Sequence, residues 1–266
     1  MLSSASHFPS ETILGIKFYS GSVDDAVGAA LNGALVMAPS GPGLAVDLVS
    51  ADSYRTALQN ADINLTDSGC MLLLWRLRTL RTLPRISGLK YLQELLRTPE
   101  LRDPQSILWV MPDAVERDRT LAFLKREGFS TTAEACYIAP HYAAQGSLQD
   151  LALNRQIVEQ NPRVVVLCVG GGVQERLGLG LREAFGARCP GIVCTGAAIA
   201  FLSGGQAHIP DWADRMSLGW AFRIASAPNK FLPRYLRALY LFCILFRYGR
   251  KMPPLRGERQ LAVPAA

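Results

Sequence analysis

The sequence predicts an α/β fold, with Rossmann-like parallel sheets and flanking helices, and three observations support it. Short β-like runs alternate with helical stretches along most of the chain, as they do in a parallel sheet. Residues 164–169 (VVVLCV) are continuously apolar and mostly β-branched, which is typical of a strand buried on both faces. The 266 residues are enough for one large α/β domain or two small ones.

The first half of the chain supplies three strands and three helices. Ser22 can cap a helix that carries Asp24 and Asp25 in its first turn. Leucines recur at helical spacing in the helix that begins at Gly88. A proline- and glycine-rich loop covers 38–43. The predicted strands are 13–18, 34–37 and 63–65, and the other helices begin near Ser22 and cover 71–80 and 88–97.

The second half repeats the alternation. Its clearest feature is the buried run 164–169, which leads into three consecutive glycines, Gly170, Gly171 and Gly172, and then a helix. No internal repeat or low-complexity segment interrupts the pattern. The predicted strands are 107–111, 164–169 and 191–194, and the predicted helices are 113–127, 151–159 and one that begins near 173.

The C-terminal segment differs from the rest of the chain in charge. Residues 223–259 hold nine of the 28 basic residues but one of the 22 acidic ones, so the net charge of +6 comes from this segment. An apolar run, 238–246, lies among the charges. Basic residues beside an aromatic-rich apolar run favour an anionic membrane surface, and the run is shorter than the ~20 residues that span a bilayer. The alternative is a last helix packed on the body with a solvated charged face.

These features divide the chain into a body at 1–222, a basic, amphipathic helical appendage at 223–252, and a disordered tail at 253–266. The N-terminus lacks a basic region followed by an apolar core, so we expect a cytoplasmic protein, peripheral on the inner face of the cytoplasmic membrane. The six cysteines form no CxxC pair, and most lie in apolar segments. We therefore expect small buried side chains, with no metal site and no cofactor.

Three features could carry chemistry. Glycines after a buried strand leave N–H groups at a helix N-terminus, where anions bind, although the turn at Gly170–Gly172 could equally be a tight connection. Asp67 follows a strand and faces the usual ligand crevice, where it could accept a proton from a hydroxyl group; it could also cap the next helix. Arg85 could clamp a phosphate or lie in solvent.

Taken together, the motifs resemble those of the WecG/TagA/CpsF family of bacterial glycosyltransferases. The resemblance extends from about residue 13 to 250 and is most specific near the C-terminus. The matching segments are NAD…TDSG at 60–69, RISG at 85–88, VGGGVQER at 169–176, FLSG at 201–204, IPDW at 209–212 and LGWAFRIASAPNKFLPRYLR at 218–237.

The resemblance implies transfer of a sugar, of a hexosyl or N-acetylhexosaminyl type, from a UDP-sugar to a polyprenyl-diphosphate-linked acceptor in cell-surface polysaccharide or exopolysaccharide synthesis, without a metal. Asp67 would be the general base. By the same resemblance, Arg85, Gly170, Gly171, Gly172, Gln174 and Glu175 would bind the donor nucleotide-sugar, and Arg223, Lys230, Arg234 and Arg237 would approach the diphosphate of the acceptor and the membrane.

Several positions depart from the family pattern. Ala38-Pro39-Ser40 replaces Thr-x-Asn, Ser68 replaces a glycine, and the lysine of the PKQE motif is absent. Acids of the family are replaced by Ala200 and Gly219, and an arginine by His208. The alternative is thus a weak or inactive homologue that acts as a membrane-associated scaffold. A nucleotide-dependent oxidoreductase and a nucleic-acid binder are less favoured; self-association is possible.

Overall fold

The structure is a computed structural model that describes residues 8–205, 225, 229 and 240–256. Its centre is an eight-stranded sheet in the order β1-β2-β4-β3-β8-β7-β5-β6, in which every neighbouring pair except β1–β2 is parallel. The predicted α/β class is therefore confirmed. The strands are β1 (Ser10–Ile13), β2 (Ile16–Tyr19), β3 (Leu35–Met37), β4 (Ile63–Asn64), β5 (Ile107–Met111), β6 (Cys136–Ile138), β7 (Val164–Leu167) and β8 (Gly191–Cys194).

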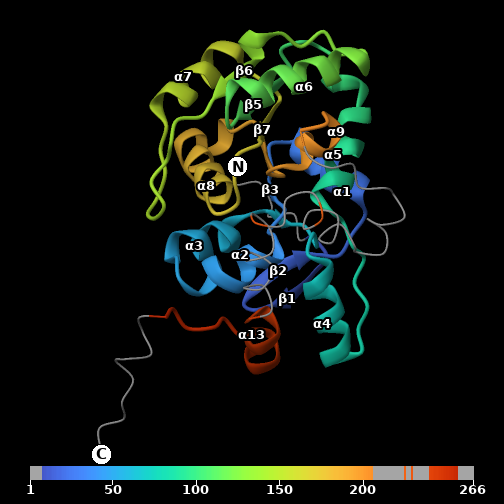
Figure 1. The fold of residues 1–266 in the computed structure, drawn as a ribbon, viewed down its shortest axis with the longest axis vertical. Coiled ribbons are helices and arrows are strands. Elements are labelled where there is room, and N and C mark those ends of the chain that lie inside the picture. Colours follow the sequence, from blue (N-terminus) through green and yellow to red (C-terminus); the bar gives the residue numbers. More distant parts are fainter. Residues whose placement is uncertain (1–7, 206–224, 226–228, 230–239, 257–266) are drawn as a thin grey trace, which may run out of the picture.

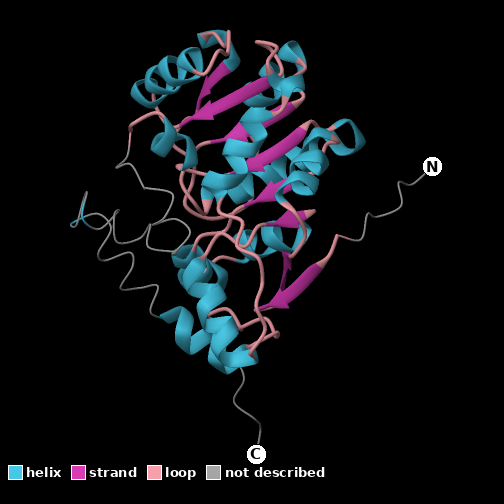
Figure 2. Cartoon of the chain, turned by 90° about the vertical axis from the view of Figure 1, so that its right-hand side faces the viewer, coloured by secondary structure: helices cyan, strands magenta, loops and turns pink. Residues whose placement is uncertain are grey.

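Helices cover both faces of this sheet, which gives a three-layer sandwich (Figures 1 and 2). One layer contains α2, α3, α4, α7, α8 and α13, and the other contains α1, α5, α6 and α9. The helices are α1 (Val23–Leu31), α2 (Gly41–Val46), α3 (Asp52–Asn60), α4 (Gly69–Thr79), α5 (Gly88–Arg97), α6 (Ala114–Arg126), α7 (Leu151–Gln160), α8 (Val173–Phe185), α9 (Ala198–Leu202) and α13 (Tyr240–Tyr248), with 3₁₀ turns at Asp47–Val49, Pro99–Leu101, Ala133–Ala135 and Gly186–Arg188.

Strand β7 shows how the sequence builds the two cores. Val164 and Val166 pack into the core beneath α1, α5, α6 and α9, whereas Val165 and Leu167 pack into the core on the other face. Successive side chains of a strand point to opposite faces, so a strand in the middle of this sandwich must be apolar at every position. This requirement explains why 164–169 was the clearest strand in the sequence.

The predicted strand 13–18 is wrong in one respect, because it is broken by a hairpin turn. Leu14 and Gly15 both have positive φ angles, of 52° and 75°, and connect β1 to β2 in an antiparallel pair. Two-residue turns with positive φ at both positions match the twist of a hairpin. The sequence did not indicate this turn because Leu14 is apolar, as a strand residue would be. Its side chain is fully buried.

The helices after β3, strand β6 and helix α9 were not predicted from the sequence. The segment read as the loop 38–43 contains the start of α2, whose N-cap is the hydroxyl of Ser40, and the chain continues through a 3₁₀ turn into α3. Glycine and proline in GPGLAV argue against a helix by propensity alone, but Leu44 and Leu48 are fully buried in the core. Tertiary packing therefore outweighs local preference here. Strand β6 is short and lies at the edge of the sheet.

The described part of the predicted appendage packs against the body. Leu241, Ile244 and Leu245 of α13 belong to the same core as α2 and α4, and α13 lies beside both helices. After α13, the carbonyl oxygens of Gly249 and Arg250 accept hydrogen bonds from the β1–β2 turn. The alternative of a last helix packed on the body therefore holds for α13, and residues 223, 224, 226–228 and 230–239 lie outside the described part.

The chain keeps defined contacts beyond α13. Arg55 donates to the carbonyl of Pro253 at 2.6 Å, and the N–H of Arg256 donates to the carbonyl of Val49 at 2.9 Å. These contacts correct the predicted start of the disordered tail, since residues 253–256 are held against the body. The remaining residues of that prediction, 257–266, lie outside the described part of the chain.

Within the described residues, no helix has the length and apolar character that a membrane span requires. The cysteines are less uniform than predicted. Cys168, Cys189 and Cys194 are buried, whereas Cys70 and Cys243 are exposed and Cys136 is intermediate. Burial raises the pKa of the Cys189 thiol to about 11, in keeping with a structural role for a buried cysteine.

The close contact between β8 and α1 gives a test of the packing. A Cβ atom at Gly191 would lie 2.0 Å from the backbone carbonyl oxygen of Ala30, so Gly191→Ala should lower the free energy of unfolding by about 1–3 kcal/mol or more. Gly28, inside α1, has no atom within 4 Å of such a Cβ. Gly28→Ala is the matched control, and we expect it to stabilise by about 0.5–1 kcal/mol in urea denaturation. Equal destabilisation by both variants would contradict this packing.

Candidate active site

The carboxyl ends of four neighbouring strands meet along one edge of the sheet. Backbone hydrogen bonds join them there: Leu65 N–H to the Met37 carbonyl, Ala38 N–H to that of Cys194, and Gly196 N–H to that of Leu167. The segments that follow β4, β3, β8 and β7 are therefore neighbours in space. This edge is where open α/β sheets bind ligands, and the predicted residues of the body fall within these segments or beside them.

Thr66 fixes the loop after β4 to the loop before α5. Its hydroxyl donates to the carbonyl of Pro84 at 2.6 Å and accepts from the N–H of Ile86 at 3.0 Å. Thr66 is fully buried, so both backbone groups have their hydrogen bonds completed by this side chain. An unmade buried hydrogen bond costs about 1–3 kcal/mol, and Thr66 therefore holds the two loops in one relative position.

Asp67 and Arg85 are brought together by this arrangement, as their motifs predicted. The Asp67 carboxylate accepts from the N–H of Gly88, the first residue of α5, at 2.9 Å. The Arg85 guanidinium donates to the backbone carbonyl of Asp67 at 3.3 Å. The alternative that Asp67 caps the following helix is wrong, because the hydroxyl of Ser68 caps α4 by accepting from Met71 at 3.2 Å. The Asp67 carboxylate is half-buried and lies at the N-terminus of α5.

The glycine turn after β7 is a strand-to-helix connection with part of its hydrogen-bonding capacity used internally. Gly172 has a φ of 86°, and its N–H donates to the Glu175 carboxylate at 2.7 Å. Gly170 and Gly171 are exposed, and a Cβ at Gly170 would meet no atom within 4 Å. The exposed half of the turn is thus the part that a ligand can approach.

Glu175 lies on the inner side of that turn and orients Gln174. Its other carboxylate oxygen accepts from the Gln174 side-chain amide at 3.1 Å. Glu175 is 1% exposed, and burial raises its pKa to about 7, although the hydrogen bonds from Gln174 and Gly172 act in the opposite direction. The nearby carboxylate of Asp47 raises the pKa further. Glu175 therefore acts on Gln174 and Gly172 and not directly on a solvent-borne ligand.

Beside the turns that follow β7 and β8, two buried polar atoms have no hydrogen-bond partner among the described residues. They are the side-chain carbonyl of Gln174 and the hydroxyl of Thr195. A Cβ at Gly196 would lie 3.5 Å from the Gln174 amide, and one at Gly88 would lie 3.6 Å from the Thr195 Cβ. Buried polar groups are rarely left unpaired, so both atoms are candidates to bind a ligand. Sequence reasoning missed Thr195, although its position directly after a predicted strand was the signal.

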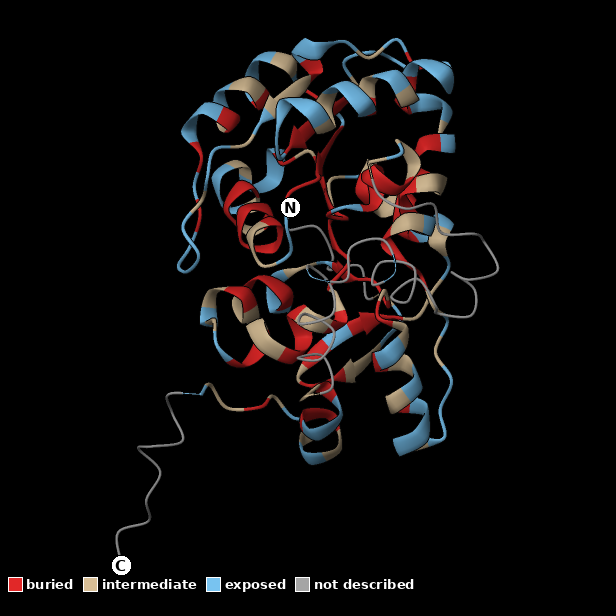
Figure 3. Ribbon diagram, in the orientation of Figure 1, coloured by how far each residue is buried: buried red, intermediate tan, exposed pale blue. Residues whose placement is uncertain are grey.

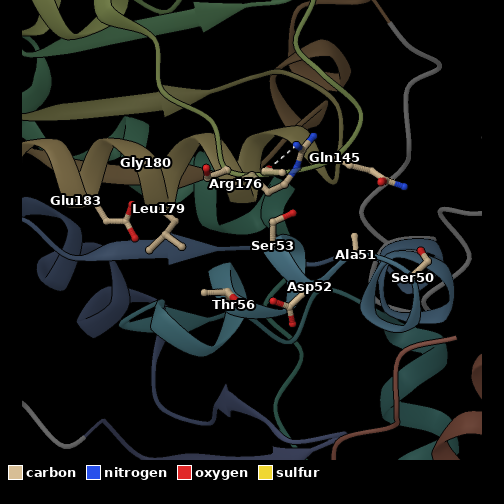
Figure 4. A pocket seen from close by; sticks show the side chains of 12 residues that line it. Ser50, Ala51, Asp52, Ser53, Thr56, Gln145, Arg176, Leu179, Gly180 and Glu183 are labelled. Carbon is tan, nitrogen blue, oxygen red and sulfur yellow. Dashed lines mark hydrogen bonds between the residues drawn. The ribbon is translucent and has the colours of Figure 1, made fainter. Parts of the chain in front are cut away.

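A separate cavity of about 460 Å³ adjoins this edge and lies between α3 and α8. Figure 4 shows side chains of the two helices facing each other across it. Arg176 borders the cavity, and its guanidinium donates to the carbonyls of Gly172, Gly146 and Ala143. None of the predicted catalytic or donor-binding residues lines the cavity, so the strand-end cluster remains the better candidate site.

The remaining predicted site residues are on the basic segment. Arg223, Lys230, Arg234 and Arg237 lie outside the described residues, and their roles stay predictions. The part of the chain that the structure describes contains no group of three His, Cys, Asp or Glu side chains arranged to hold a metal ion.

Fold and site together define an α/β protein whose polar groups gather at the carboxyl ends of parallel strands, the arrangement of nucleotide-utilising enzymes. The family model described as "Glycosyl transferase WecG/TagA/CpsF family" matches residues 11–254. The chain belongs to this family, and it is a glycosyltransferase of the type that acts in cell-surface polysaccharide synthesis. No curated protein matches the chain significantly.

The buried carboxyl of Glu175 should make stability depend on pH. Its folded pKa, about 7, lies above the ordinary value of 4.5, so the folded state binds more protons between those values and stability falls as the pH rises through that window. Glu175→Gln should remove this fall. We expect the difference in unfolding free energy between the two proteins to change by roughly 1–3 kcal/mol from pH 5 to pH 8, measured by urea denaturation. Parallel pH profiles would contradict the buried, proton-binding carboxyl.

Proposed function

We propose that this protein transfers a hexosyl or N-acetylhexosaminyl group from a UDP-sugar to a polyprenyl-diphosphate-linked sugar. The family supports sugar transfer, in general from a nucleotide-sugar to a lipid-linked acceptor. The observation that carries the finer proposal is the cluster at the strand ends, where a carboxylate, a guanidinium and two unpaired buried polar atoms lie on neighbouring segments.

Asp67 is the general base of the proposed reaction. The acceptor hydroxyl oxygen attacks the anomeric carbon of the donor, the bond from that carbon to the UDP oxygen breaks, and the hydroxyl proton passes to the Asp67 carboxylate. One carboxylate oxygen is held by Gly88 at 2.9 Å. This bond orients the carboxylate, whose other oxygen accepts the proton in this proposal.

The donor lies along the remaining strand ends in this proposal. Arg85 and the backbone N–H groups of the exposed residues Gly170 and Gly171 stabilise the negative charge that develops on the leaving UDP, which allows the reaction to proceed without a metal. The unpaired oxygens of Gln174 and Thr195 accept hydrogen bonds from the donor. Glu175 and Gly172 hold Gln174 and the turn in place.

The basic segment supplies the membrane-facing part of the proposal. Arg223, Lys230, Arg234 and Arg237 would approach the diphosphate of the acceptor, and the protein would act on the inner face of the cytoplasmic membrane. The charge excess of 223–259 supports this role, since juxtamembrane cations are attracted to anionic lipid.

One observation favours the alternative of a non-catalytic scaffold. The segment after β3 offers the donor little, because Ala38 is apolar and the Ser40 hydroxyl already caps α2 by accepting from Gly43 at 3.3 Å. Isothermal titration with UDP and a panel of UDP-sugars separates the two functions. Binding of one donor supports the transferase, and no binding, with or without lipid-linked acceptor, supports the scaffold.

Asp67→Asn tests the assigned base. An asparagine oxygen can still accept from Gly88, so the variant removes the negative charge and leaves the local hydrogen bond. We expect turnover to fall by a factor of about 10²–10⁴, with the dissociation constant for the UDP-sugar nearly unchanged. The rate of UDP release in the presence of acceptor measures the first quantity, and titration calorimetry measures the second.

Asp52→Asn is the matched control, because Asp52 is an exposed carboxylate on α3 beside the separate cavity. It should retain wild-type turnover. Full activity in Asp67→Asn would contradict the assignment of the base, and equal losses in both variants would show that the effect is not specific to the strand-end cluster.

A further inference from the structure

Helix α4 is apolar on two opposite sides. Met71 and Trp75 face the core and are buried. Leu73, Leu77 and Leu80 recur at intervals of four and three residues, and they are 58%, 62% and 90% exposed. Side chains at this spacing form one stripe on a helix. Apolar residues all round a helix indicate that both sides are buried in use, so the outer side of α4 requires an explanation.

The exposure of Leu80 at the end of α4 also requires an explanation. Leu80 ends α4 in the left-handed conformation, with a φ of 59°, a position where glycine or asparagine is favoured. A leucine here strains the backbone and makes almost no contact with the protein. The side chain therefore has no packing role within the described structure, and its exposure at the end of α4 is consistent with a role in binding.

The neighbouring helix α13 packs against the other side of α4, the side that holds Met71 and Trp75. The two helices pack side by side and project together from one end of the molecule (Figure 1). Phe242 on α13 is 50% exposed, and the Arg78 side chain of α4 donates a hydrogen bond to the carbonyl of Phe246. Figure 3 shows exposed residues on both helices at this end. Leu73, Leu77 and Leu80 are called the apolar stripe below.

The charges within α4, α13 and the residues that follow each helix have one sign. Residues 69–81 and 240–256 contain seven basic residues and no acidic residue: Arg76, Arg78, Arg81, Arg247, Arg250, Lys251 and Arg256. Glu11 forms ion pairs with two of them, Arg81 at 3.5 Å and Arg250 at 2.5 Å. An apolar surface surrounded by cations is complementary to an anionic lipid surface, whose headgroups attract the cations while the acyl region accepts the leucines.

We propose that the apolar stripe of α4 inserts into the headgroup region of an anionic bilayer, so that the body itself, and not the basic segment alone, binds the membrane. This surface has a fixed relation to the site, because α4 begins directly after Asp67-Ser68. Leu77 lies roughly 12 Å along the helix from Gly69 at 1.5 Å per residue. The proposal deepens the proposed function and rests on it only for the acceptor's place at the membrane.

Vesicle binding by the full-length chain, without nucleotide or acceptor, tests the surface. Leu73→Gln/Leu77→Gln/Leu80→Gln should lower the apparent partition coefficient onto phosphatidylglycerol-containing vesicles about tenfold or more in cosedimentation. Arg76→Gln should lower it by roughly fivefold on these vesicles and leave binding to neutral phosphatidylcholine vesicles unchanged. Leu77→Gln alone should give a smaller loss, and it replaces the triple variant if that protein does not fold.

Leu151→Gln/Val158→Gln is the matched control, since both side chains are exposed on α7 at the opposite end of the molecule (Figure 1). This variant should bind vesicles as the wild type does. Wild-type binding by the Leu77 variants would overturn the proposal, as would an equal loss in the control. Loss of self-association in analytical ultracentrifugation, with vesicle binding intact, would instead assign the stripe to a second copy of the chain. Failure of the proposed chemistry would appear in Asp67→Asn turnover and not in this assay.

Discussion

The tie between the loop after β4 and the loop before α5 is the constraint on which the candidate site depends. Thr66 joins the two loops through two hydrogen bonds of a fully buried hydroxyl, and Asp67 adds a third to the first residue of α5. A carboxylate on a surface loop would otherwise sample many orientations. Because both bonds of Thr66 are buried, breaking them leaves unpaired backbone groups, and Asp67 keeps one position relative to Arg85.

On the side of the site formed by the glycine turn, the burial of Glu175 determines which groups can bind an anion. Glu175 has no exposed surface to share with solvent, and its carboxylate is committed to Gly172 and Gln174. Asp47 lies near the same turn. The Gly172 N–H is already used by Glu175, so the exposed glycines and Arg85 are better placed for the diphosphate. The partial occupation of this helix N-terminus explains why the glycine motif, taken alone, was a weak signal in the sequence.

The sequence predicted those features that depend on local pattern. Strands 107–111 and 191–194 and the helix 88–97 agree with the structure in both bounds, because each has clear periodicity and a boundary signal. The placement of Asp67 and the glycine turn along one edge of the sheet followed from the general rule that the carboxyl ends of parallel strands share an edge. The helices after β3 were missed because glycine and proline have low helix propensity, whereas tertiary contacts hold this segment in helical form.

Long-range contacts account for the other differences. The local sequence of 240–256 does not predict that α13 packs into a core with Met71 and Trp75. It also does not predict that the β1–β2 turn forms hydrogen bonds with Gly249 and Arg250. The charge excess of the segment suggested a membrane-associating appendage, with a last helix packed on the body as the alternative. The apolar residues of α13 are divided between the core and the surface. Thr195 and Arg176 were missed for the same reason, since their importance depends on which loops lie against them and not on their own neighbours in sequence.

Hydrogen–deuterium exchange with and without UDP tests the central claim, that the strand-end cluster is the donor site. UDP is the leaving group of every UDP-sugar, so the measurement does not depend on which sugar is transferred. We expect UDP to slow exchange in the segments 67–69, 85–88, 169–174 and 195–197, and to leave α6 and α7 unchanged. Slower exchange at the cavity between α3 and α8, with none at the strand ends, would contradict the account.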